Sequence, residues 1–421
     1  MTKRKICVIG LGYIGLPTSA LLANRGYDVH GVDVVQHVVD TINQGKIHIV
    51  EPELDMLVHA AVKEGYLKAV TTPEPADAFL IAVPTPFLPC AEGEIPAPDL
   101  TYIESACRSI APVLKNGDLV ILESTSPVGA TEQVAEWLAA ARSDLCFPQT
   151  AGDAADVNVA HCPERVLPGH VVRELVQNDR VIGGISATCS ARSVELYKIF
   201  VEGDCIITNA RTAEMAKLTE NSSRDVQIAF ANELSMICDK LDINVWELIR
   251  LANRHPRVNI LQPGPGVGGH CIAVDPWFIV SKTPAEARLI HMARVVNDSK
   301  PDWVIKKVKI AIADFLQANP EKTAKDITIA CYGLAFKPDI DDLRESPAMA
   351  ITQKIMQMHK GTVIAVEPNI EFMPSKLTNV ELVDFEVASK VADIHVMLVD
   401  HQDFKIKTLI SDYLIDTKGI W

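Results

Sequence analysis

Short apolar runs separated by polar or glycine-rich loops dominate the first half of the chain. The first run, Lys5 to Ile9, hardly alternates between apolar and polar residues, as expected of a parallel strand buried on both faces. An apolar helix candidate follows it and extends through Leu22. Further strand candidates, each ending in a polar or Gly/Pro loop, lie at Tyr27 to Val32, Ala78 to Val83, Leu119 to Glu123, Val157 to His161 and Arg180 to Ile182. Strands that alternate with helices predict a largely parallel α/β sheet.

The last third of the chain repeats this pattern. An apolar run from Ile327 to Tyr332 meets Gly333 and a polar loop, and a helix candidate begins near Pro347. Gly361 to Val366 and Asp393 to Leu398 supply two more strand candidates. The segment therefore predicts a second, smaller doubly wound domain.

The segment between these sheets is helical in pattern. Thr208 to Leu241 contains neither proline nor glycine, and a second helix candidate covers Asn244 to Ala252. Lys217, Asn221 and Arg224 are spaced by four and three residues along the long helix, so they share one face. Such a polar stripe is often simply solvated, but a helix of this length also often joins domains or subunits.

Together these patterns predict an α/β protein with three parts. Two doubly wound Rossmann-like domains, residues 1–207 and 306–421, are joined by a central helical domain, residues 208–305, which contains the long helix. We expect the first domain to bind NAD.

Composition and charge narrow the class of protein. The 421 residues are 48% hydrophobic and 22% charged, with a formal net charge of −14, which argues against general binding of nucleic acid or a membrane surface. The ten cysteines form no CxxC pair or His/Cys cluster, so we expect reduced thiols in the cytoplasm and no metal site. No apolar run reaches membrane-spanning length, and the first run is too short for a signal peptide.

A glycine turn follows the first strand. Gly10, Gly12 and Gly15 open a helix, with Tyr13 and Ile14 between the last two, and the second strand ends in Asp33. Glycines allow the backbone to approach a pyrophosphate at a helix N-terminus, and an acid about 20 residues later can bind ribose hydroxyls. No arginine follows Asp33 directly, so the motif favours NAD over NADP.

Two threonines follow later strands of the first sheet. Ligands of open sheets collect at the carboxyl ends of strands, which places Thr85 and Thr125 beside the cofactor. Both segments could equally be plain turns with Ser/Thr caps.

One cysteine lies in a loop with no room for regular structure. The stretch QPGPGVGGHCIAVDPW, residues 262–277, sets Cys271 among glycines and prolines and places Asp275 four residues later. Asp275 and Pro276 predict a helix N-cap and first helical residue. A thiol just before a helix start is favoured as thiolate, so we interpret Cys271 as a nucleophile. The alternative is a small apolar side chain buried in a tight loop.

Charged residues mark three further loops. Glu164 and Arg165 follow a strand, His255 and Arg257 precede the cysteine loop, and Lys337 and Arg344 follow the first strand of the second sheet. Arginine binds phosphate in a bidentate geometry, which makes these loops candidates for a phosphorylated ligand. Surface ion pairs, or the acids at 339, 341, 342 and 345, could equally neutralise them.

Across essentially its whole length, the chain resembles the UDP-sugar 6-dehydrogenase family, also called the UDP-glucose/GDP-mannose dehydrogenase family. The motifs GLGYIG, ESTSPVG, CPER, AKLTEN, GVGGHC with Asp275, and FKPDIDDLRESP occur in the family's order and spacing. The segments KIHIVEPEL and RHPRVN, together with His270 in GGHC, resemble the branch that oxidises UDP-N-acetylmannosamine.

The resemblance implies a four-electron, NAD-dependent oxidation of a sugar CH₂OH to a carboxylate, for bacterial surface polysaccharide synthesis. Cys271 captures the aldehyde as a thiohemiacetal that is oxidised to a thioester. Lys217 and Asn221 stabilise the oxyanion, Glu164 handles the hydrolytic water, and Asp275 assists proton transfer near Cys271. The residues implied in binding the UDP-sugar are Arg165, Val166, Lys217, Asn221, Arg224, His255, Arg257, Gly268, Phe336 and Lys337, with Arg344 at the cofactor.

Several alternatives stay open. The partner copy in a homodimer or higher homo-oligomer could supply Arg257. The sugar could be UDP-N-acetylglucosamine or UDP-glucose, since the configuration at carbon 2 is recognised by pocket shape. A two-electron dehydrogenase of the hydroxyacid or 6-phosphogluconate type would leave the second sheet and the cysteine loop without a role. A non-catalytic sensor of nucleotide-sugar and NAD is the alternative from another class.

Overall fold

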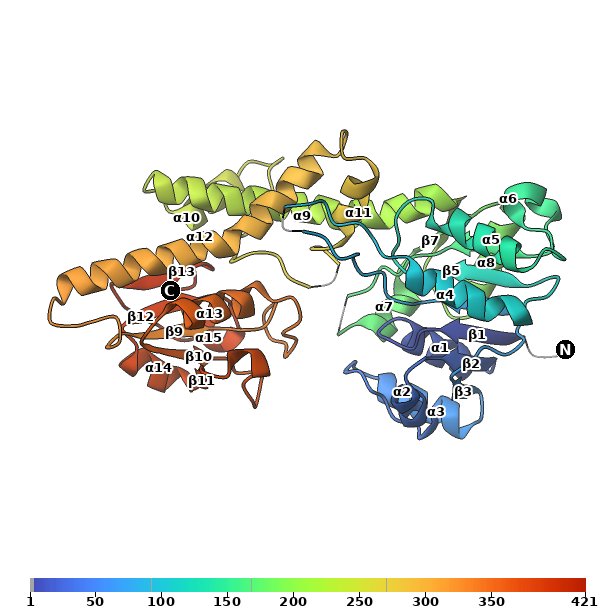
Figure 1. Ribbon diagram of the computed structural model, residues 1–421, viewed down its shortest axis with the longest axis horizontal. Helices are drawn as coiled ribbons and strands as arrows, with labels where there is room; N and C mark the ends of the chain where they lie inside the picture. The colour runs from blue at the N-terminus through green and yellow to red at the C-terminus, as the bar shows by residue number, and fades with distance from the viewer. Residues whose placement is uncertain (1–3, 92, 168, 270) are drawn as a thin grey trace. The chain divides into compact units, whose positions relative to one another are not determined.

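The computed structural model describes residues 4–91, 93–167, 169–269 and 271–421 (Figure 1). His270, on which part of the resemblance rests, lies outside the described residues. The chain divides into two compact units. Unit 1 holds the residues through Glu220 together with Trp277–Thr283, and unit 2 holds Asn221–Pro276 and Pro284–Trp421.

Unit 1 is built on an eight-stranded sheet with the order β3-β2-β1-β4-β5-β6-β7-β8. All neighbours are parallel except β6 and β7. The first six positions have the strand order of a dinucleotide-binding domain. The strands are β1 (Lys5–Ile9), β2 (Asp28–Val32), β3 (Leu67–Val70), β4 (Ala78–Ile81), β5 (Leu119–Leu122), β6 (Asn158–His161), β7 (Arg180–Gly184) and β8 (Cys205–Asn209).

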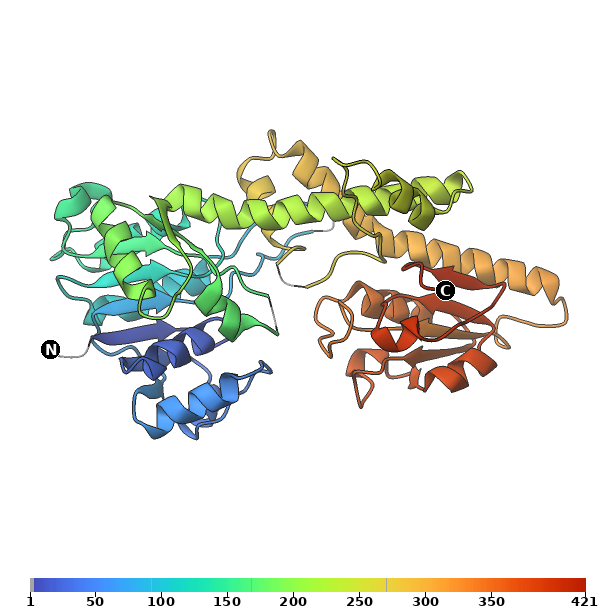
Figure 2. The same cartoon turned by 180° about the vertical axis from the view of Figure 1, so that it is seen from behind.

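Helices cover both faces of this sheet (Figure 2). Ile6 and Val8 of β1 enter the core under α1, α3 and α7, whereas Cys7 and Ile9 enter the core under α4 and α5. Burial on both faces explains why the strand is apolar at every position. The helices are α1 (Gly15–Asn24), α2 (Gln36–Asn43), α3 (Leu54–Lys63), α4 (Thr101–Ile110), η1 (Ala111–Val113), α5 (Ala130–Ala141), α6 (Pro148–Ala151), η2 (Gly152–Ala154), α7 (Val171–Gln177) and α8 (Ala187–Tyr197).

Unit 2 contains a five-stranded, all-parallel sheet with the order β11-β10-β9-β12-β13. Ile329 and Cys331 of β9 face one core, and Ala330 and Tyr332 face the other, so the same two-sided burial recurs. The strands are β9 (Thr328–Tyr332), β10 (Thr362–Val366), β11 (Glu381–Leu382), β12 (Ile394–Met397) and β13 (Leu414–Asp416). Its later helices are α13 (Pro347–Met358), η3 (Ser375–Leu377), α14 (Phe385–Val391) and α15 (Gln402–Lys405).

The middle of the chain is helical. These helices are α9 (Ala210–Lys240), α10 (Val245–Ala252), α11 (Asp275–Lys282) and α12 (Arg288–Ala318). The predicted long helix is therefore confirmed, and the Asn244 side chain caps α10 by accepting from the Glu247 N–H. The helix predicted after the cysteine loop is also confirmed, although Asp275 is its first residue and not its N-cap.

The pattern of apolar residues missed several elements, among them β3, β8 and α12. β3 alternates between buried and exposed positions, and β8 lies largely exposed at the sheet edge, so neither has a continuous apolar run. Helix α12 carries Pro301 in its interior, which normally ends or kinks a helix. Tertiary packing overrides local preference at all three.

Glu214 ties the start of α9 to the sheet of unit 1. Its buried carboxylate accepts hydrogen bonds from the Gly129 N–H at 2.7 Å, the Thr131 N–H at 2.7 Å and the Thr131 hydroxyl at 2.6 Å. These donors lie at the N-terminus of α5, where an anion satisfies N–H groups that have no partner within the helix. Burial raises the pKa of Glu214, and the three hydrogen bonds oppose this shift.

We expect Glu214→Ala to lower the free energy of unfolding by about 3 kcal/mol, because it leaves buried donors unsatisfied. Chemical denaturation at neutral pH measures this loss. Glu132→Ala is the matched control, since Glu132 joins the same two helices through an exposed ion pair with Arg211. It should cost less than about 1 kcal/mol. Equal losses in the two variants would contradict the assigned role of Glu214.

Candidate active site

Each glycine of the first turn has a separate steric role. Gly10 has φ +92°, and an added Cβ would lie 2.5 Å from the Ala82 carbonyl oxygen. A Cβ on Gly15 would overlap the Gly10 carbonyl oxygen, so α1 packs directly on the turn. A Cβ on Gly12 would meet no heavy atom within 4 Å. Only Gly12 therefore keeps open space over the helix N-terminus, where a pyrophosphate requires close approach.

Asp33 lies beside this turn at the end of β2. Its carboxylate accepts from the Leu11 N–H at 3.1 Å and from the Val35 N–H at 3.0 Å. The first contact fixes the acid against the glycine loop, in which Tyr13 and Ile14 also lie half-buried. A carboxylate in this place suits the two hydroxyls of a ribose.

Thr85 and Thr125 occupy neighbouring loops. Ser124 donates its hydroxyl to the Val83 carbonyl at 2.7 Å, which ties the loop after β5 to the loop after β4. The Thr85 hydroxyl is buried and has no hydrogen-bond partner within the described residues.

Glu164 and Lys217 form a buried ion pair within unit 1. The Lys217 ammonium lies 3.0 Å from the Glu164 carboxylate, and their side chains are only 6% and 11% exposed. The second Glu164 oxygen accepts from the Val166 N–H at 2.9 Å, which fixes the orientation of the carboxylate. Strand β6 and helix α9 thus place an acid and an amine side by side in a desolvated setting, as acid–base chemistry requires.

Arg165 points to a different partner. Its guanidinium pairs with Glu220 at 2.7 Å, where both side chains are about a third exposed, and it donates to the Asp179 carbonyl at 3.2 Å. The structure therefore contains the surface ion pair that was one of the two interpretations of this arginine.

Two buried charged residues near Glu164, namely Glu123 and Arg180, had no role in the sequence predictions. Glu123 is buried and accepts from the Tyr197 hydroxyl at 2.7 Å, and the Arg180 guanidinium lies over the Tyr197 ring at 5.2 Å. Burial raises the pKa of Glu123, with Arg180 opposing the shift. Arg180 also interacts electrostatically with Glu164. In sequence, Glu123 and Arg180 were only a strand end and a strand start, so no local signal marked them.

Cys271 lies exposed at the entry to α11 in unit 2. Its carbonyl accepts from the Val274 and Asp275 N–H groups at 3.1 and 2.9 Å, and this turn leads directly into the helix. Asp275 is buried and accepts from the Asn221 amide at 2.5 Å. Cys271 therefore lies exposed on a tight turn that leads into the N-terminus of α11.

The loop before Cys271 packs on the polar loop after β9. A Cβ on Gly268 would lie 2.5 Å from the Glu345 carbonyl oxygen and 3.1 Å from Cβ of Phe336. Gly269 has φ +82° and faces the Phe336 ring. Glu345 itself has a left-handed φ of 50°, a strained conformation that the surrounding contacts must maintain.

The other predicted ligand groups of unit 2 differ in exposure. Arg344 forms a bidentate pair with Asp342, with its closest contact at 2.6 Å, so the local neutralisation considered for this loop does occur. Lys337 is half-buried in the same loop. Arg224, His255 and Arg257 are exposed, and the Arg257 N–H donates to the His255 ring at 3.4 Å.

Comparison with known proteins covers nearly the whole chain. Residues 4–201, 211–299 and 330–421 match the NAD binding domain, the central domain and the UDP binding domain of the UDP-glucose/GDP-mannose dehydrogenase family. The cofactor is therefore NAD. No helix in the described part of the chain is long and apolar enough to cross a membrane.

Individual relatives match over their full length. A Yersinia pestis protein named UDP-N-acetyl-D-mannosamine dehydrogenase is 64% identical, with 100% of both chains covered. A Ralstonia nicotianae protein named NDP-N-acetyl-D-galactosaminuronic acid dehydrogenase is 63% identical, with 99% of this chain and 96% of that protein covered. The solved UDP-D-ManNAc dehydrogenase of Pyrococcus horikoshii has a TM-score of 0.84 at 37% identity and covers 99% of this chain and 96% of its own.

The steric difference between two glycines predicts different outcomes for the same substitution. Gly12→Ala should keep wild-type stability, because its Cβ has open space, but weaken NAD binding about tenfold by occupying the place of the pyrophosphate. Gly15→Ala should instead lower stability by at least about 2 kcal/mol, since the methyl group overlaps the turn. Thermal unfolding and NAD titration measure both effects, and a destabilised Gly12→Ala with normal NAD affinity would contradict this assignment.

Proposed function

The chain belongs to the UDP-glucose/GDP-mannose dehydrogenase family and is an NAD-dependent dehydrogenase, and from this premise we propose that it oxidises UDP-N-acetyl-D-mannosamine at carbon 6 to UDP-N-acetyl-D-mannosaminuronate. The observation that carries the proposal is Cys271, exposed on a turn at the N-terminus of α11 with the buried Asp275 at the start of that helix. Full-length relatives named for this substrate support the choice of sugar.

The proposed chemistry proceeds in three stages that balance. The alcohol loses a hydride and a proton to give the aldehyde, and the Cys271 thiolate adds to its carbonyl carbon. Loss of a second hydride and of the hydroxyl proton converts this thiohemiacetal to a thioester. Water then cleaves the carbon–sulfur bond, which gives the carboxylate and regenerates the thiol. Gly10, Gly12, Gly15 and Asp33 would hold NAD, which would supply the acceptor for each hydride.

The protein's side chains supply charge and proton transfer. The ammonium of Lys217 and the amide of Asn221, one helical turn apart on α9, stabilise the developing oxyanion. Glu164, oriented by Lys217 and by the Val166 N–H, takes the proton of the hydrolytic water. Asp275 exchanges protons near Cys271. Tyr13, Ile14, Thr85, Thr125 and Arg344 complete the proposed set of cofactor-binding residues.

The remaining candidate site residues bind the nucleotide-sugar in this proposal. These are Arg165, Val166, Arg224, His255, Arg257, Gly268, Phe336 and Lys337. Arg165 must exchange its ion pair with Glu220 for a ligand phosphate, which an exposed pair permits at small cost. The division into residues 1–207, 208–305 and 306–421 assigns the cofactor, the cysteine loop and the UDP moiety to one domain each.

We also propose that the protein is a homodimer. Phe230, Leu289 and Met292 are 52%, 68% and 58% exposed and line a cavity of about 460 Å³ together with Arg257. An exposed apolar patch of this kind on two helices favours a protein partner, and a second copy would bring its own Arg257 to the patch. A monomeric sedimentation profile would contradict this part of the proposal.

We place the reaction in the cytoplasm, in the synthesis of a bacterial surface polysaccharide.

Limiting substrate should yield two NADH per UDP-sugar, because the thioester route removes two hydrides. Absorbance at the NADH band measures this ratio. Cys271→Ser should form no acid, since an oxygen nucleophile at this position lacks the low-energy anion of a thiol. One NADH per sugar would exclude the thioester route. Binding of both ligands without any absorbance change would favour the non-catalytic sensor.

Turnover should be faster on UDP-N-acetyl-D-mannosamine than on UDP-N-acetylglucosamine, UDP-N-acetylgalactosamine or UDP-glucose. The galactosamine derivative belongs in the comparison because of the Ralstonia relative. Initial rates at equal concentrations of the purified sugars, expressed as kcat/KM, give the ranking. Faster turnover of any other sugar would overturn the assigned substrate while leaving the cysteine mechanism in place.

A further inference from the structure

Two helices of unit 2 are joined by buried polar side chains. Residues of α9 contact residues progressively later in α12, so the two helices run in parallel along this contact. Six residues with exposures of 5% or less form this polar seam: Asp225, Asn232, Ser235, Arg294, Asn297 and Lys300. Buried polar groups between helices fix their register, because any slip leaves them without partners.

The hydrogen bonds of the seam form a chain with a single direction. The Gly264 N–H donates to Asn232 Oδ1 at 2.9 Å, and the Asn232 amide donates to Asn297 Oδ1 at 2.9 Å. The Asn297 amide then donates to the Asp225 carboxylate at 2.8 Å. A backbone N–H can only donate and a carboxylate can only accept, so both ends set the orientation of the two amides.

The chain begins on the loop that carries the thiol. Gly264 lies seven positions before Cys271, and the described residues between them, 265–269, form no helix or strand. The loop is held again at Gly268, against Glu345 and Phe336, and at Asp275, by Asn221. Through the Gly264 contact, a buried side chain of the polar seam, Asn232, also reaches the loop.

We propose that Asn232 is a positioning residue for the Cys271 loop, and that Asn297 acts through it by fixing the orientation of its amide. This inference rests on the proposed nucleophilic role of Cys271. Asn232 touches neither substrate nor cofactor in the proposed mechanism. Its effect is to hold one end of the loop in place, so that the thiol keeps its position at the start of α11.

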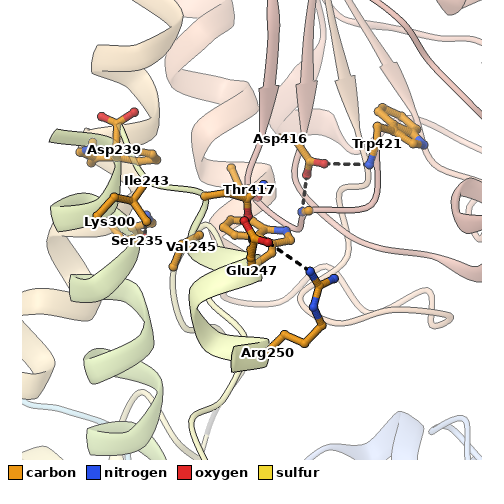
Figure 3. Close-up of a pocket in the computed structure, with 14 residues that line it drawn as sticks. Ser235, Asp239, Ile243, Val245, Glu247, Arg250, Lys300, Asp416, Thr417 and Trp421 are labelled. Atoms are coloured by element: carbon orange, nitrogen blue, oxygen red, sulfur yellow. Dashed lines mark hydrogen bonds and ion pairs between the residues drawn. The ribbon is translucent and has the colours of Figure 1, made fainter. Parts of the chain in front are cut away.

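The alternative is that Asn232 only stabilises the helix pair. Another residue of the polar seam, Ser235, is the control that separates this role from positioning of the loop. Ser235 lies almost one turn further along α9, donates to the Asn232 carbonyl at 2.6 Å and pairs with Lys300 at 2.5 Å. Figure 3 shows this pair at the wall of a cavity of about 650 Å³. Ser235 stabilises the same helix pair and has no hydrogen bond to the loop among the described residues, so its loss should affect stability without moving the thiol.

The test compares Asn232→Leu, Asn232→Asp and Ser235→Ala in the full-length protein. Asn232→Leu should lower kcat about 10- to 100-fold, as expected when a reacting group is displaced by about 1 Å. Its KM for NAD should stay within about twofold. Alkylation of Cys271 by iodoacetamide, followed by peptide mass spectrometry across a pH series, should slow at least about threefold at neutral pH, because the thiolate loses its place at the helix end.

The two other variants separate position from stability. Asn232→Asp keeps the acceptor for the Gly264 N–H, so its alkylation profile should stay close to wild type even if it is less stable. Ser235→Ala should lower the melting temperature but keep kcat and the alkylation profile within about twofold. The inference is overturned if Asn232→Leu matches wild type in both readouts, or if Ser235→Ala changes them as much as Asn232→Leu does.

Failure of the proposed function gives a different result. If Cys271→Ser still forms acid, the nucleophile assignment fails whatever the Asn232 variants do. The alkylation profiles require no turnover, so they still decide whether Asn232 sets the position of the thiol.

Discussion

A loop rich in glycine and proline has no hydrogen-bond ladder of its own, so contacts from outside must impose its shape. This constraint governs the segment around Cys271. Pro263, Gly264 and Pro265 are buried, and the Gly264 N–H binds a side chain from the core of α9. Gly268 leaves space for a backbone carbonyl, and Asp275 begins a helix. A reactive thiol must be exposed, and the surrounding structure supplies the order that the loop itself lacks.

Buried charge is the second theme of this structure. Glu164 with Lys217, Asp225 with Arg294 and Glu214 with the N-terminus of α5 all remove charge from water against a specific partner. Losing one partner of such a pair is strongly destabilising, because the other charge stays buried. The same desolvation that makes these groups costly also allows an ion pair such as Glu164 and Lys217 to respond to a reacting group.

Chemistry and substrate identity depend on different features. In the proposed mechanism, the nucleophile and the acid–base pair are each one or two side chains at fixed positions, and the dinucleotide turn is set by three glycines. The sugar at the reacting end is distinguished by the configuration of single carbons, which only the shape of a pocket can read. Relatives about equally similar to this chain, at 64% and 63% identity, carry the names of different N-acetylhexosamine derivatives. Overall similarity therefore identifies the reaction more firmly than the sugar.

The sequence by itself determined the two largely parallel sheets, the glycine turn, the long helix and the helix after the cysteine loop. These features follow from local rules: two-sided burial makes a strand apolar throughout, and a positive φ requires glycine. It could not reveal β8, which lies exposed at a sheet edge, or α12, which contains Pro301. Only tertiary structure decided that Lys217 meets Glu164 and that Asn232 reaches Gly264. Each of these contacts joins residues from different elements or loops, and their pairing depends on how the chain packs, which local sequence patterns do not encode.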